Sequence, residues 1–66
     1  MEDQALHLTV ARVRIYRPEV SAEYIREVVD QWLATSRQPE NEVDQDIVFI
    51  YESSLRWVEH SKGQGR

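Results

Sequence analysis

The chain has 66 residues and no cysteine, so it can hold one small domain and no disulfide bond. Its 12 acidic and 8 basic residues give a net charge of −4, which disfavours non-specific binding to nucleic acid or to an anionic membrane. No apolar run approaches the roughly 18 residues of a membrane span, and no basic, apolar leader opens the sequence. We therefore expect one cytoplasmic domain over residues 1–66, with disordered tails at residues 1–5 and 62–66.

Residues 9–16 predict a half-buried β-strand, because their side chains alternate in character. One face of this strand carries Thr9, Ala11, Val13 and Ile15, and the other carries Val10, Arg12, Arg14 and Tyr16. The strand should end at Arg17, since Pro18 cannot donate a hydrogen bond to a β-ladder.

A helix is expected next, beginning after Ser21, whose hydroxyl can accept from the free N–H groups of the first turn. Val20 and Ile25 occupy the two positions of a hydrophobic staple, and Glu23 complements the helix dipole. The apolar face of this helix is wide enough to need two neighbours. The helix should end shortly before Pro39.

The segment 41–61 fits two structures. As one helix, it gathers most of its apolar side chains in a single stripe, and Asn41 can cap its start. The alternative is a pair of strands, 47–51 and 55–60, joined by a turn without the glycine or asparagine that short turns favour. We favour the helix, although it leaves Phe49 alone on the polar face.

The expected fold class is therefore α+β: an N-terminal strand followed by two helices (β-α-α), with β-α-β-β as the alternative.

A single core of this size rarely leaves more than about 3–5 kcal/mol of stability, so small domains usually need a further source of stability, such as a disulfide bond, a metal ion or oligomerisation. The two histidines, His7 and His60, are too far apart in sequence to suggest a metal cluster. Association into a homodimer is the simplest remaining source of additional stability.

No motif in the sequence predicts catalysis, a cofactor or a metal ion. Both glycines, Gly63 and Gly65, lie near the C-terminus, so no glycine-rich loop can cradle a phosphate or a dinucleotide. The acidic run at residues 40–46 lacks the glycine and the distal glutamate of a calcium-binding EF-hand loop. We therefore expect a non-enzymatic protein with no cofactor and no metal site.

The order strand, helix, helix, with arginines on the strand, resembles the ribbon-helix-helix family of dimeric DNA-binding proteins. The resemblance covers residues 9–61 and lies in element order and charge placement. It implies that Arg12 and Arg14 read bases in the major groove and that Arg17 contacts a phosphate. In that family the second helix offers its N-terminus to phosphate, whereas carboxylates occupy that end here.

The charge favours a second interpretation, a small interaction or regulatory module such as an inhibitor, an antitoxin-like regulator or an adaptor. A larger partner protein with a basic surface would face the acidic run, with Phe49 as the apolar anchor of the contact. The expected partner-binding residues are Phe49, Glu40, Glu42, Asp44 and Asp46. The two tryptophans, Trp32 and Trp57, are common interface residues but are expected here in the core.

Overall fold

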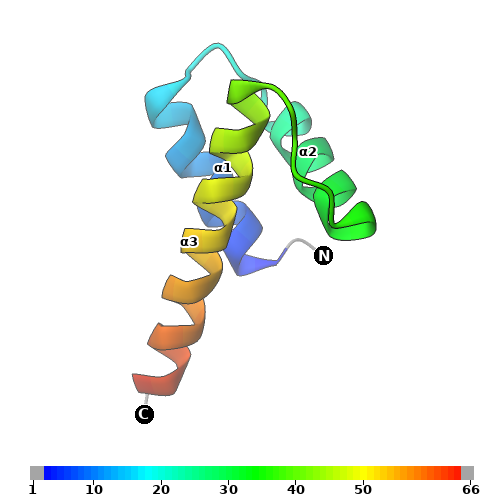
Figure 1. Ribbon diagram of the computed structural model, residues 1–66. Helices are drawn as coiled ribbons and strands as arrows, with labels where there is room; N and C mark the ends of the chain where they lie inside the picture. The colour runs from blue at the N-terminus through cyan, green and yellow to red at the C-terminus, as the bar shows by residue number, and fades with distance from the viewer. Residues whose placement is uncertain (1–2, 65–66) are drawn as a thin grey trace.

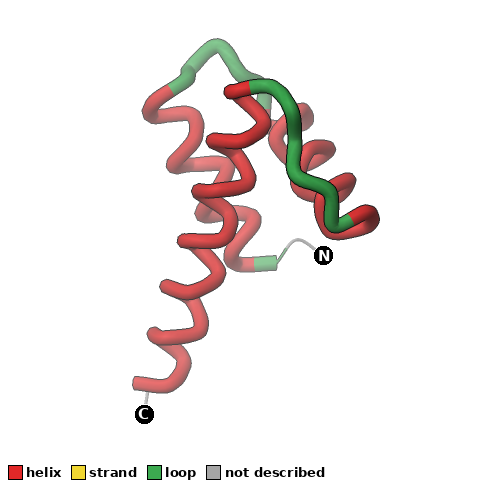
Figure 2. Tube along the Cα trace, viewed as in Figure 1, coloured by secondary structure: helices red, strands yellow, loops and turns green. Residues whose placement is uncertain are grey.

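The computed structural model describes residues 3–64, with side chains for residues 3–61. The described chain forms three helices, α1 (Gln4–Tyr16), α2 (Ala22–Thr35) and α3 (Glu42–Gln64) (Figure 1). No part of the described chain is a strand (Figure 2). The expected α+β class, its N-terminal strand and the β-α-β-β alternative are therefore wrong, and the fold is a helical bundle.

The segment expected as a strand belongs to α1, which begins where Asp3 caps it. The Asp3 carboxylate accepts hydrogen bonds from the backbone N–H of Ala5 at 2.7 Å and of Leu6 at 3.3 Å. An aspartate at this position satisfies N–H groups that have no partner within the helix. The cap therefore lets α1 begin at Gln4, before the alternating residues 9–16 that predict a strand.

The buried side chains of α1 follow a helical period and not a period of two. Ala5, Thr9 and Val13 are each buried, and successive members are one helical turn apart. Ile15, which the strand would place on the same face as Val13, is 74% exposed. A strand would leave its backbone N–H and C=O groups to be paired by another chain, whereas a helix pairs them within the segment.

The start and the end of α2 are as the sequence predicts. The Ser21 hydroxyl accepts a hydrogen bond from the Tyr24 N–H at 3.1 Å, which confirms the expected cap. Ile25 is fully buried on the inward face of the helix. Ser36 follows the last turn in the left-handed region, with φ of 59°, and its N–H donates to the Trp32 carbonyl oxygen at 2.7 Å.

The contested C-terminal segment is helical, so the helix expected over residues 41–61 is confirmed. The Asn41 side-chain oxygen accepts a hydrogen bond from the Asp44 N–H at 2.8 Å, as expected of a cap. The pair of strands that competed with this helix is therefore absent from the described chain.

Parts of both expected tails are helical or cap a helix in the structure. Residues 3–5, expected in a tail, cap and open α1, and the Ala5 side chain is buried in the core. Residues 62–64 continue α3 instead of ending it. The remaining positions of the expected tails, residues 1–2 and 65–66, lie outside the described residues.

The third helix packs against both of the others and most extensively against α1, which runs antiparallel to it (Figure 1). Four buried side chains of α3 recur every three or four residues, namely Ile47, Tyr51, Ser54 and Val58, and Val48 beside this row is also buried. Small buried residues, among them Ala5 on α1 and Ser54 on α3, allow the two backbones to approach closely. The C-terminal half of α3 extends beyond the other two helices (Figure 1).

Tyr51 of α3 interacts with residues of both other helices. Its hydroxyl donates a hydrogen bond to Asp3 Oδ2 at 3.3 Å, so the residue that caps α1 also binds α3. Its ring meets the Trp32 ring of α2 edge to face, with centroids 6.1 Å apart and ring planes at 78°. The Tyr51 side chain is buried, so these contacts fix the three helices around one point of the core.

Asp3→Ala is expected to lower the free energy of unfolding by about 1–2 kcal/mol, because it removes both the α1 cap and the acceptor of the Tyr51 hydroxyl. Asp3→Asn is the matched control and should lose less, since asparagine keeps a side-chain oxygen for the cap. Urea unfolding followed by circular dichroism measures both variants. Unchanged stability in Asp3→Ala would contradict the assigned cap.

The stability of the fold should also depend on the ionisation of Tyr51. Burial, followed by the negative charge of Asp3 and the hydrogen bond to it, raises the pKa of Tyr51 above its ordinary value of 10. The folded state then holds the phenolic proton more tightly than the unfolded chain, so this contribution is complete below about pH 10 and is lost as the pH rises further. The free energy of unfolding should fall less steeply above about pH 10 in Tyr51→Phe than in the parent. Parallel pH profiles for the two proteins would show that another group is responsible.

Candidate functional site

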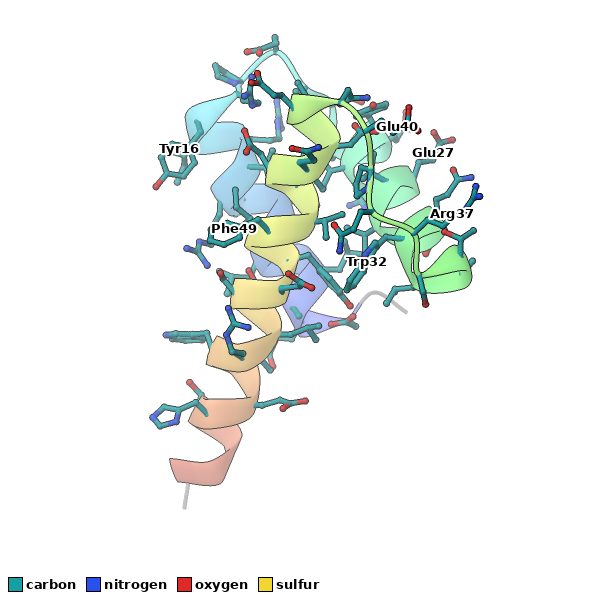
Figure 3. All side chains as sticks on the ribbon, in the orientation of Figure 1. Tyr16, Glu27, Trp32, Arg37, Glu40 and Phe49 are labelled. Carbon is teal, nitrogen blue, oxygen red and sulfur yellow. The ribbon has the colours of Figure 1, made fainter. Side chains whose placement is uncertain are left out.

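The five residues expected to bind a partner lie in more than one place. Glu40 and Asp44 border a cleft between α2 and the loop that joins α2 to α3. Asp46 and Phe49 border a groove between α1 and α3. Glu42 is exposed on α3 and borders neither. Figure 3 shows this separation, with Glu40 on the α2 side of the molecule and Phe49 on the other side.

The cleft beside α2, which we call the α2 cleft, has a volume of about 640 Å³ and is open to solvent. Its charged and aromatic lining residues are Tyr24, Glu27, Trp32, Arg37, Glu40 and Asp44. Three carboxylates against one guanidinium make the cleft acidic. Figure 3 shows Glu27, Trp32, Arg37 and Glu40 together on this side of the molecule.

Hydrogen bonds hold the loop wall of the α2 cleft at both ends. The Gln45 side-chain amide donates to the carbonyl oxygens of Pro39 at 3.1 Å and Glu40 at 3.4 Å. Near the end of α2, the Arg37 backbone N–H donates to the Thr35 hydroxyl at 3.3 Å. These hydrogen bonds limit the freedom of the loop, so binding in the cleft should require little further ordering of it.

Tyr24 and Asp44 connect α2 to α3 at the cleft. The Tyr24 hydroxyl donates to Asp44 Oδ1 at 2.5 Å, and the Asn41 side-chain amide donates to Asp44 Oδ2 at 3.2 Å. The hydrogen bond to Asp44, followed by burial and the Asp44 charge, raises the pKa of Tyr24 above 10. Because both Asp44 oxygens already accept hydrogen bonds, Glu27 and Glu40 are the carboxylates more available to a ligand.

Trp32 connects the α2 cleft to the core. Its half-buried side chain packs against the Tyr51 ring and also lines the cleft. The sequence favours the core for Trp32, because its position on the apolar face of a helix does not show whether one edge of the ring stays exposed.

Glu27 and Arg37 line the cleft but are not among the expected site residues. In the sequence they differ from other surface residues only by their charge. The path of the loop decides which charged residues come together, and the sequence does not show that path.

The α1–α3 groove has a volume of about 500 Å³ and an aromatic border. Phe49 is 65% exposed and Tyr16 is 72% exposed, and Figure 3 shows both on the same side of the molecule. Arg17 forms an ion pair with Asp46 at 2.8 Å beside them. The isolation of Phe49 on the polar face therefore reflects an exposed position on a correctly predicted helix.

The arginines expected to read DNA lie on or directly after a helix and not on a strand. Arg14 is exposed, whereas Arg17 is paired with Asp46. Arg12 is half-buried and lies 3.5 Å from the Ser54 hydroxyl. The strand that would pair across a dimer and enter the major groove is absent from the described chain. The fold therefore removes the basis of the resemblance to ribbon-helix-helix proteins.

Comparison of the chain with protein-family models, with curated proteins and with solved structures finds no match. No helix in the described part has the length and apolar character needed to cross a membrane. Among the same residues, no group of three or more histidine, cysteine, aspartate or glutamate side chains is placed to hold a metal ion. The α2 cleft and the surface around Phe49 are therefore the two candidate binding sites of the described chain.

Asp44→Asn is expected to lower the pKa of Tyr24 towards its ordinary value of 10, because an amide carries no charge and accepts a weaker hydrogen bond. An NMR titration of the tyrosine ring carbons, assigned with Tyr24→Phe, measures the change. Glu42→Gln is the control, since Glu42 does not border the cleft, and it should leave the Tyr24 titration unchanged. A Tyr24 pKa that does not respond to Asp44→Asn would contradict the hydrogen bond.

Proposed function

We propose that this chain is a small, non-enzymatic interaction module that binds a basic segment of a partner protein in the α2 cleft. The observation that carries the proposal is an excess of carboxylates beside two aromatic rings in one cleft. Arginine and lysine side chains are the protein groups that match both features. A partner with a basic surface, as the sequence suggests, would therefore bind in the α2 cleft.

Two kinds of contact contribute to binding in the α2 cleft. Glu27 and Glu40 pair with the cation, but solvated ion pairs are each worth only about 0–1 kcal/mol. A cation over the face of Trp32 or Tyr24 adds about 0.5–1 kcal/mol at an exposed site. The aromatic rings therefore favour a segment that presents its cations at the cleft over a diffusely basic surface.

In the proposed complex, Glu27 and Glu40 act through charge and hydrogen bonding to the partner.

Titration with hexa-arginine amide is expected to saturate and to change the fluorescence of Trp32. The expectation that Trp57 lies in the core is wrong, because its side chain is 62% exposed and lines neither the cleft nor the groove. A Trp57→Phe background therefore isolates the Trp32 signal. In this background, Glu27→Gln combined with Glu40→Gln should raise the dissociation constant about tenfold, equivalent to about 1.4 kcal/mol. Hexaglutamate is the negative control for the titration.

The matched control variant combines Glu19→Gln with Glu59→Gln. It removes the same charge from exposed positions that do not line the cleft, so the dissociation constant should stay within about twofold of the parent value. An equal loss in the two double variants would show general attraction to an acidic protein and contradict a cleft site. Absence of saturable binding to both hexa-arginine and hexa-lysine would contradict the proposed function itself.

A further inference from the structure

The outward face of α3 carries a self-complementary pattern. Glu42, Phe49 and Arg56 are spaced seven residues apart, and all three are exposed. Seven residues are about two turns of an α-helix, so these side chains form one line along the helix. We call this line the α3 stripe. It has an acidic group at one end, an aromatic ring in the middle and a basic group at the other end.

The rest of the fold leaves the α3 stripe uncovered. The opposite face of α3, which includes Ile47 and Tyr51, is the one buried against α1 and α2. Phe49 remains 65% exposed, and Tyr16 lies beside it across the groove. Exposed aromatic side chains bordered by charged residues mark an interaction surface. Arg56 makes no ion pair with any side chain of residues 3–61, so its charge is available to a partner.

We infer that the α3 stripe is the interface of a homodimer in which two copies of α3 lie antiparallel, with the two Phe49 side chains at the two-fold axis. Antiparallel pairing centred on Phe49 sets Glu42 of each copy beside Arg56 of the partner subunit. The two-fold axis repeats this contact at the other end of the interface. A parallel pairing in register would oppose like charges at both ends, so the charge pattern selects the antiparallel arrangement.

The flanking positions fit the same register. Asp46 precedes Phe49 by three residues, and Ser53 follows it by four, so both lie on the same side of the stripe. The antiparallel arrangement therefore places Asp46 opposite Ser53 of the partner subunit, where a hydroxyl can donate to the carboxylate. No like charges meet at this position. A second copy of the chain thus fits this polar flank of the surface as well as its centre, with Asp46 Oδ2 already paired to Arg17 of its own chain.

A second chain can add stability to a domain of this size. A core built from so few residues supplies little stability alone, and oligomerisation is one of the usual supplements. The proposed interface covers Phe49 and lies on the α3 side of the molecule, apart from the α2 cleft. Each dimer would therefore present two α2 clefts, and the interface does not depend on whether those clefts bind a basic segment.

Sedimentation equilibrium of the full chain tests the homodimer directly. Over about 5–200 µM, the mass should approach twice the 7.8 kDa of one chain as concentration rises. Phe49→Ser should raise the dissociation constant at least about tenfold while leaving the helical circular dichroism unchanged, because Phe49 is exposed. Leu33→Ser is the matched control, since Leu33 is an exposed apolar residue on α2, and it should leave the dimer intact. The mass of a single chain throughout the range would overturn the inference.

Exchange of the two charges tests the register. Glu42→Lys alone and Arg56→Glu alone each oppose like charges at both ends of the interface, so each should raise the dissociation constant by about tenfold. The double variant, Glu42→Lys with Arg56→Glu, restores opposite charges and should dimerise within about threefold of the parent. Recovery in the double variant cannot arise from unfolding. Failure to recover, or a dimer unaffected by all of these changes, would overturn the proposed interface.

Discussion

The buried ring of Tyr51 contacts Trp32 of α2, and its hydroxyl reaches Asp3, the residue that caps α1. One side chain of α3 therefore fixes the positions of both other helices. Trp32 in turn lines the α2 cleft, so the geometry of the cleft is tied to the core. A small domain with few buried residues needs such shared contacts, because each one limits several elements at once.

The sequence predicts most accurately those elements whose signals are local. The side chains of Ser21 and Asn41 cap helices at the expected positions, and the apolar period of the last segment outweighs its strand-like stretch. The first helix escapes prediction because Thr9 and Val13 are compatible with both a period of two and a helical turn. The signal that distinguishes the helix from the strand is Asp3, which can cap a helix, followed by the small residue Ala5. Both residues fall in the segment that is expected to be a disordered tail, so this signal does not enter the prediction.

The sequence identifies charged and aromatic surface residues but not how the fold groups them. Phe49 is exposed on α3, and Glu40 lines a cleft, while the binding of a partner by either residue stays a prediction. The acidic run between residues 40 and 46 nevertheless does not form one surface. A helix turns by about 100° per residue, so residues of this run face different directions after α3 begins. Trp32 joins the cleft only because the loop runs back beside α2 (Figure 2).

The most direct test of the three-helix arrangement is an NMR measurement on the isotopically labelled chain that combines Cα chemical shifts with nuclear Overhauser effects. The packing around Tyr51 predicts helical shifts throughout residues 9–16 and Overhauser effects between the ring protons of Trp32 and Tyr51. Extended shifts in residues 9–16, or the absence of contacts between these two rings in a folded sample, would contradict it.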